Sequence, residues 1–117
     1  MYSIGKVFTF SASHQLAFGP NHPCSRLHGH NYTVEIELRA EDLDVRGAIV
    51  DYGDLRALKT YLDDRYDHRH LNDVMHLSPT AENLAEQIFR FAVANWSETR
   101  SVTVRETPST WARFSLD

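Results

Sequence analysis

The chain has 117 residues, of which 42% are hydrophobic and 24% are charged, and its formal net charge is −4. This composition is typical of a folded domain with a hydrophobic core and excludes a disordered or fibrous protein. No Lys/Arg block marks a nucleic-acid surface, and no apolar run approaches the roughly 20 residues of a membrane span. With a single cysteine and no secretory pattern, we expect one cytoplasmic domain over residues 1–117, with no nucleic-acid or membrane partner.

The first half of the chain predicts mainly β-structure. Residues 2–14 and 28–39 both alternate apolar and polar side chains, which is typical of half-buried antiparallel strands. Residues 17–23 contain Gly and Pro and predict the loop that joins them. After a polar turn, the segment AIVDY (48–52) predicts a short returning strand.

Two helices are predicted next. Leucines at helical spacing predict a first helix from about Leu55, which gives way to residues 63–73, a segment too polar to lie in the core. Ser78 or Thr80 can cap a second helix, because either hydroxyl can accept a backbone N–H of the first turn. The apolar stripe of this second helix runs to Ala92.

A closing hairpin is predicted from residues 101–106 and 110–116. The element order is then β-β-α-α-β-β, apart from the short strand. We therefore expect an α+β fold, with an antiparallel sheet and two helices on one of its faces. Such a sheet has two open edges, which proteins usually cover, and this favours self-association.

Histidines mark the candidate site. His28 and His30 point to the same side of a strand, because strand side chains alternate. If the first two strands pair as a hairpin, His14 at the end of the first lies opposite them. Three neutral imidazoles would then form an open zinc site, with the fourth position left for water or substrate. Three further histidines in loops are expected to face solvent, namely His22, His70 and His76.

Cys24, the only cysteine, permits two interpretations. It could be the fourth ligand of a closed, structural metal site. It could instead lie beside the metal as a thiolate base or nucleophile, with its pKa lowered by the cation. Spacing does not separate these, although structural zinc sites usually contain more cysteine, which favours the second interpretation.

Two further groups carry candidate chemistry. Asp67 directly precedes His68 after the first helix, and a carboxylate can orient an imidazole for proton transfer. Glu106 shares the inward face of its strand with Val102 and Val104. An inward carboxylate needs a partner, which could be a ligand with N–H donors or a structural arginine.

Six segments in order resemble one known family. They are FSASHQL (10–16), CSRLHGHNY (24–32), DYGDL (51–55), DHRHLND (67–73), PTAENLA (79–85) and VRET (104–107). The chain resembles, nearly end to end, the 6-pyruvoyl-tetrahydropterin synthase / 6-carboxy-tetrahydropterin synthase family. The three residues between Cys24 and His28 look like the 6-carboxy type of queuosine biosynthesis, because the pyruvoyl enzymes typically have a longer gap.

The resemblance implies a zinc lyase that converts 7,8-dihydroneopterin triphosphate to 6-carboxy-5,6,7,8-tetrahydropterin, releasing acetaldehyde and triphosphate. It also implies the tunnelling fold, in which protomers join their sheets into a barrel and usually stack as hexamers with sites at subunit interfaces. The implied site residues are the zinc ligands His14, His28 and His30, the base Cys24, the acid/base His68 with Asp67 behind it, and the pterin anchor Glu106.

Two alternatives stay open at this point. The same fold could make 6-pyruvoyl-tetrahydropterin, or the chain could be a non-catalytic zinc module closed by Cys24. The residues that would hold a triphosphate are also open. The candidates are Arg26, Lys59, Arg69, Arg100 and Arg105.

Overall fold

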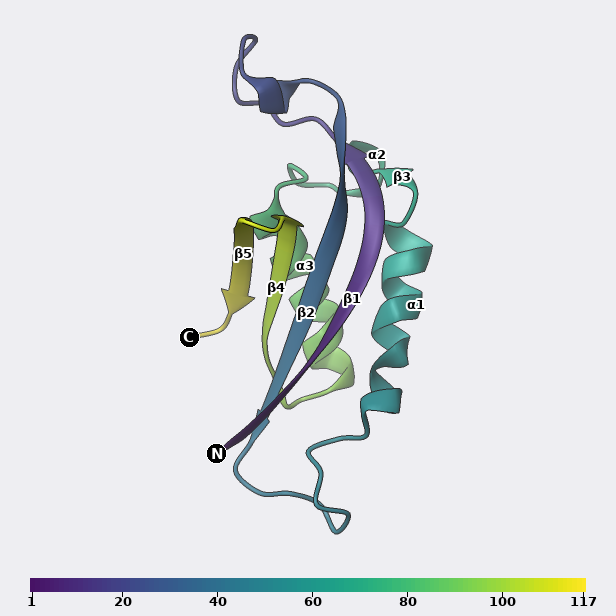
Figure 1. Ribbon diagram of the computed structural model, residues 1–117, viewed down its shortest axis with the longest axis vertical. Helices are drawn as coiled ribbons and strands as arrows, with labels where there is room; N and C mark the ends of the chain where they lie inside the picture. Colours follow the sequence, from purple (N-terminus) through teal and green to yellow (C-terminus); the bar gives the residue numbers. More distant parts are fainter.

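Five strands form one sheet in the order β3-β1-β2-β4-β5 in the computed structural model, which describes residues 1–117 (Figure 1). Neighbouring strands are antiparallel, except that β3 runs parallel to β1. The helices lie against one face of this sheet, which confirms the predicted α+β class. The strands are β1 (Tyr2–His14), β2 (His28–Ala40), β3 (Arg69–His70), β4 (Thr99–Thr107) and β5 (Thr110–Ser115).

The hairpin of β1 and β2 is the longest pairing in the sheet. Its register is unbroken from Tyr2 opposite Ala40 to His14 opposite His28. The even-numbered side chains face the helices, and Tyr32 and other even residues of β2 are fully buried. Each large apolar side chain buried in this way contributes about 1.5–3 kcal/mol, so the alternation seen in the sequence fixes which face is inside.

Two main helices, α1 (Arg56–Arg65) and α3 (Ala81–Asn95), cover the inner face of the sheet. A short helix, α2 (Leu71–Val74), lies between them in the chain. Thr80 is the N-cap of α3, since its hydroxyl accepts the N–H of Asn83 at 3.2 Å, whereas Ser78 is not the cap. No helix in the structure has both the length and the apolar character needed to cross a lipid bilayer.

The prediction of a short strand at residues 48–52 is wrong. Asp51 accepts the N–H of Gly53 at 2.7 Å and starts a 3₁₀ turn, Tyr52–Leu55, which leads the chain directly into α1. The extra strand is β3 instead, which pairs with β1 at only two positions.

The prediction that residues 63–73 are too polar for the core is also wrong in part. Tyr66 and Leu71 are fully buried, although the charged residues around them are not. Two apolar side chains are enough to anchor this segment, because a buried aromatic or leucine contributes as much as any other core residue.

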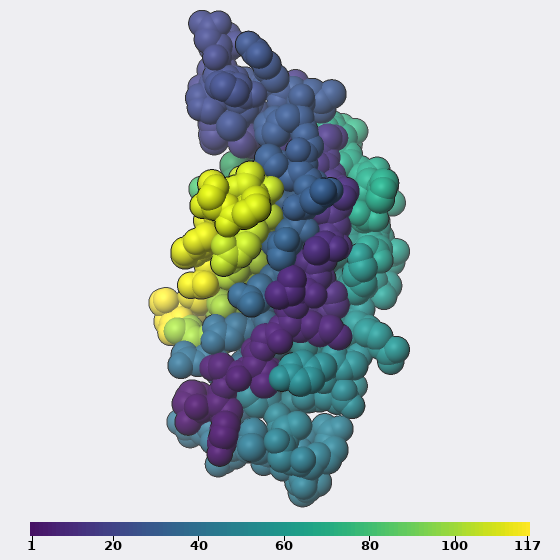
Figure 2. Space-filling model, viewed as in Figure 1, coloured from purple at the N-terminus to yellow at the C-terminus, as the bar shows by residue number.

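The molecule is elongated, with extents of 55 × 27 × 25 Å. The segment between β1 and β2 projects beyond the sheet at one end, and the segment before α1 projects at the other (Figures 1 and 2). The paired ends of β1 and β2 that carry the histidines therefore lie at the base of the first projection.

Candidate metal centre and cavity

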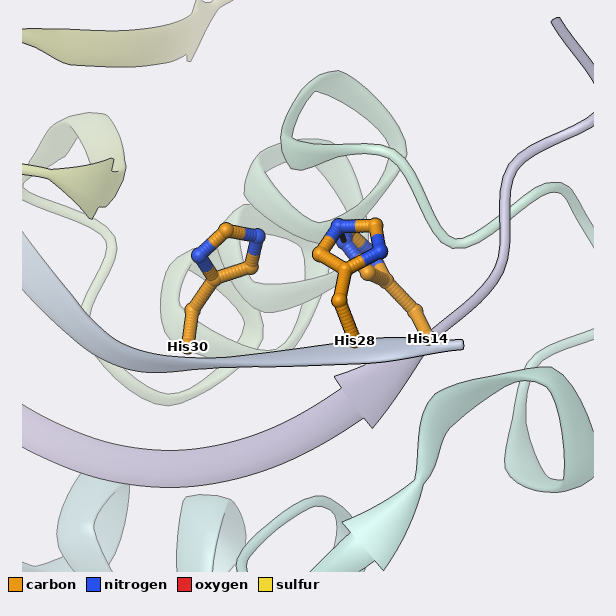
Figure 3. Close-up of side chains that lie close together, drawn as sticks. All are labelled: His14, His28 and His30. Carbon is orange, nitrogen blue, oxygen red and sulfur yellow. Dashed lines mark hydrogen bonds between the residues drawn. The ribbon is translucent and has the colours of Figure 1, made fainter. Parts of the chain in front are cut away.

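The three histidines converge as the hairpin pairing predicts. His14, the last residue of β1, is opposite His28, the first residue of β2, and His30 follows on the same face (Figure 3). Their ligand atoms all lie within 4.8 Å of one another. His14 is fully buried, whereas His28 and His30 are half-buried. One imidazole is thus fixed in the core and two are open to the outside.

Backbone carbonyls determine the protonation of two of these rings. The Nδ1 atom of His14 lies 2.8 Å from the Pro79 carbonyl oxygen, and Nδ1 of His28 lies 2.8 Å from that of Arg26. A carbonyl oxygen only accepts, so each Nδ1 carries the proton that it donates. The neutral rings then turn the lone pairs of their Nε2 atoms toward each other at 2.9 Å. Two facing lone pairs repel unless a cation lies between them, so this geometry fits a metal ion.

Burial favours the neutral form of two of the three imidazoles, His14 and His30. Burial lowers the pKa of His14 and of His30 below the ordinary value of 6.5, although the Glu106 carboxylate opposes this shift. Its Oε2 lies 3.5 Å from Nε2 of His14 and 3.7 Å from Nε2 of His30. Since only neutral imidazole donates a lone pair to a metal, the lowered pKa values favour metal binding at neutral pH.

A cavity of about 340 Å³ opens beside the cluster. Its wall includes Cys24, His28, His30 and Glu106, which come from the projecting segment, β2 and β4. The group of converging ligand atoms contains the three histidines and not Cys24. The thiol therefore faces the same space as the ligands without closing the site, which favours an open centre.

The backbone of Cys24 is held on both sides. Its N–H donates to Nδ1 of His22 at 3.0 Å, and its carbonyl accepts the N–H of Leu16 at 2.8 Å. His22 is exposed, as expected, but it also caps the 3₁₀ turn Pro23–Ser25 that carries the cysteine. The sequence gives no signal for this role, because histidine is not a typical N-cap.

The two other loop histidines differ in their surroundings. His76 is exposed, as expected. His70 is half-buried in β3, and its Nδ1 lies 2.9 Å from the Ser13 hydroxyl, so the expectation that it faces solvent is wrong. It is drawn in because β3 pairs with β1 at Ser13.

The Asp67–His68 pair is preformed but lies outside this cavity. Asp67 accepts from Nδ1 of His68 at 2.8 Å and from the N–H of Ser11 at 2.9 Å. These contacts, Ser11 first, lower the pKa of Asp67. The N–H of His68 donates to the Ser11 carbonyl, its φ is +58°, and its side chain is 82% exposed. Neither residue lines the cavity, so the pair is presented outward from the β1 edge.

Comparison with known proteins matches this architecture over the whole chain. Residues 3–117 match the family model described as 6-pyruvoyl tetrahydropterin synthase. The 6-carboxy-5,6,7,8-tetrahydropterin synthase of Bacillus subtilis is 32% identical over 126 residues, covering 97% of this chain and 84% of the relative. A Rickettsia felis protein of the same name is 30% identical, covering 68% of this chain and 71% of its own. The Caenorhabditis elegans 6-pyruvoyl tetrahydropterin synthase structure has a TM-score of 0.86 at 25% identity, covering 99% and 96% of the two chains.

Proposed function

The chain belongs to the 6-pyruvoyl tetrahydropterin synthase family of lyase-type enzymes, and on that premise we propose that it makes 6-carboxy-5,6,7,8-tetrahydropterin. The substrate would be 7,8-dihydroneopterin triphosphate, with release of acetaldehyde and triphosphate, in queuosine biosynthesis. The observation that carries the proposal is the pair of facing imidazole lone pairs beside a cavity that a thiol and a carboxylate also line. The 6-carboxy product is favoured by the names of the relatives and by the three-residue gap before His28.

We propose that His14, His28 and His30 hold a zinc ion. Three imidazoles with an open fourth position are typical of catalytic rather than structural zinc. When bound, zinc would supply Lewis-acid chemistry, which makes the C–H and O–H bonds of the substrate side chain more acidic. Cys24 is the group in the cavity suited to take the proton from that side chain, because a thiolate next to a cation is stable near neutral pH.

Glu106 is the proposed anchor of the pterin ring. A carboxylate can accept two hydrogen bonds from the N–H and NH₂ edge of a pterin, which is a strong, charge-assisted pairing. Its Oε2 lies 3.5 Å from Nε2 of His14, so a pterin bound there would lie next to the histidine cluster. The substrate side chain would then extend past the cluster toward Cys24.

We propose that the Asp67–His68 pair acts in the cavity of a neighbouring copy. The His68 ring is exposed and is already oriented by Asp67, and the φ of His68 is one that non-glycine residues rarely adopt, which is common at functional sites. This requires a homo-oligomer, for which the family resemblance implies a hexamer, and such an assembly would also cover the open edges of the sheet. We propose that each copy is a single domain over residues 1–117 and that the oligomer is cytoplasmic.

The candidates for binding the triphosphate can be narrowed. Lys59 already contacts Asp63 and the Thr9 carbonyl, and Arg100 pairs with Asp117. The other three have no ion pair or side-chain hydrogen bond in this chain, and they are the ones we propose for the triphosphate. They are Arg26, Arg69 and Arg105.

Incubation with 7,8-dihydroneopterin triphosphate, followed by mass spectrometry, tests the proposal. We expect 6-carboxy-5,6,7,8-tetrahydropterin and acetaldehyde, and the His28→Ala variant serves as the inactive control. A product that keeps all side-chain carbons would instead identify a 6-pyruvoyl enzyme, which the Caenorhabditis elegans structure keeps as the second candidate. Absence of any turnover from a zinc-loaded oligomer would favour a non-catalytic zinc module.

A further inference from the structure

A buried tyrosine hydroxyl lies next to His14, at the ring nitrogen that does not face the other histidines. Tyr32 follows His30 on the same face of β2 and is fully buried. Its ring stacks on Phe10 with centroids 4.8 Å apart and planes 11° apart, which fixes the direction of its hydroxyl. That oxygen lies 3.2 Å from Nδ1 of His14.

His14 is the only hydrogen-bonding partner of this hydroxyl. A hydroxyl buried in an apolar core costs about 1–3 kcal/mol unless it is hydrogen-bonded, so a phenylalanine would suit this position better if packing alone mattered. Because the Pro79 carbonyl already makes Nδ1 the proton-bearing nitrogen, the Tyr32 oxygen is a second acceptor facing the same N–H. Two acceptors on one N–H restrict rotation of the ring and raise the electron density on its other nitrogen.

The three histidines differ in how many hydrogen-bond acceptors their rings contact. His14 has two such partners, and His28 has one, the Arg26 carbonyl. His30 has no hydrogen bond from its ring to a backbone carbonyl or hydroxyl. His14 is also the fully buried ring, so it is the fixed point to which the two more exposed rings adjust.

We propose that Tyr32 is a positioning residue whose hydroxyl, together with the Pro79 carbonyl, fixes the tautomer and direction of His14 for metal binding. The proposal rests on the metal-binding role of the cluster proposed above. In the sequence, Tyr32 has only the pattern of an apolar strand residue, and the proposal gives it a role in the metal site.

Tyr66 provides a matched control. It is fully buried and packs against Phe10, with ring centroids 5.6 Å apart. Its hydroxyl donates to Oε1 of Gln87 at 2.8 Å and has no contact with a histidine. Tyr32→Phe and Tyr66→Phe each remove one buried, bonded hydroxyl from the same core, and each keeps the ring.

The test measures metal binding rather than turnover. Each protein is stripped of metal, its zinc affinity is measured by competition with a chromogenic chelator, and the visible spectrum of its cobalt(II) form is recorded. We expect Tyr32→Phe to bind zinc about 10–100-fold more weakly, with altered cobalt bands, which is the usual effect of removing an outer partner of a ligand. Tyr66→Phe should keep the wild-type affinity and spectrum while its thermal stability falls.

Three results would overturn the inference. If Tyr32→Phe keeps the wild-type zinc affinity and cobalt spectrum, the role of Tyr32 is overturned, but the proposed metal-binding role of the histidines is not. Equal losses of affinity in both variants would assign the effect to general stability. A wild-type protein that binds no zinc would overturn this inference together with the metal site of the proposed function.

Discussion

His14 and His28 are direct partners across the β1–β2 hairpin, and their Nε2 atoms lie 2.9 Å apart. The distance is a property of strand register, because a slip of one residue would send the ring of His28 to the opposite face. The histidine cluster is therefore built by the same pairing that buries the core.

His28→Ala and His14→Ala should both lose zinc and activity, but with different effects on the fold. The half-buried His28 can be removed with little change in the stability of the metal-free protein. Removing the fully buried His14 leaves the Tyr32 hydroxyl without a partner, at a cost of about 1–3 kcal/mol in the free energy of unfolding. Metal analysis and urea unfolding measure the two effects. His76→Ala is the control, and full zinc content in either ligand variant would mean that the ligands are wrong.

Cys24→Ala should keep its zinc while its turnover falls about 10²–10⁴-fold, the usual contribution of a positioned acid or base. Because Cys24 is the only cysteine, iodoacetamide should inactivate the wild type through this thiol alone, and the variant should take up no label. Zinc content by atomic absorption accompanies the rate measurements. If zinc disappears in parallel with activity, Cys24 is a ligand and the site is closed.

Mixed oligomers should reveal whether Asp67 and His68 serve a neighbouring copy. Cys24→Ala and His68→Ala are each expected to be inactive, yet co-refolding equal amounts should restore roughly one site in four, since intact halves meet at random across a repeated interface. Cys24→Ala mixed with His28→Ala is the control, because both residues line one cavity of one chain. No recovery in the first mixture would place the pair outside the shared site.

The stabilising contribution of Asp67 should depend on pH. The N–H of Ser11 and the His68 ring lower its pKa below the ordinary 3.8, and Lys59 acts in the same direction. A lowered carboxyl pKa stabilises the fold above the unfolded-state value, and this contribution is lost as pH falls through the folded-state value. Asp67→Asn should therefore be less stable than wild type near pH 5.5, and the difference should shrink toward about pH 3.

Urea unfolding of the metal-free proteins across this range measures that difference, since zinc would otherwise be displaced by protons at low pH. Asp63→Asn is a suitable control, because its carboxylate lies exposed on α1 and contacts only Lys59. A gap between Asp67→Asn and wild type that stays constant from pH 5.5 to pH 3 would contradict the prediction.

The parts of the fold that the sequence predicts are those governed by long periodic patterns. Thirteen paired positions of alternating polarity predict the β1–β2 register, and with it the convergence of His14 with His28. The short elements follow other rules. The β3 strand has two residues and is held by backbone and Asp67 contacts to Ser11, which leave no periodic signal. The 48–52 segment has the composition of a strand, but one side-chain bond from Asp51 redirects it.

The surroundings of the histidine cluster are harder to predict for a related reason. Pro79 belongs to a helix-start pattern and Tyr32 to an apolar strand face, and each pattern is correct for the element that it describes. Their contacts with His14 cross 65 and 18 positions of the chain. The β1–β2 pairing brings Tyr32 to His14, and the placement of the start of α3 beside the sheet brings Pro79 to the same ring. No local sequence motif predicts either contact.

Cys24 lies on the projecting segment, whereas the three histidines lie on paired strands. The thiol and the histidines therefore belong to two parts of the molecule that can change separately. Strand pairing spaces the three rings of the cluster, so residues added to or removed from the segment between β1 and β2, away from Arg26, would leave that spacing unchanged. Changes in this segment would thus alter the position of the cysteine while keeping one arrangement of the three histidines. Transplanting segments of different length between homologues would then test whether the segment decides the reaction outcome at an unaltered histidine triad.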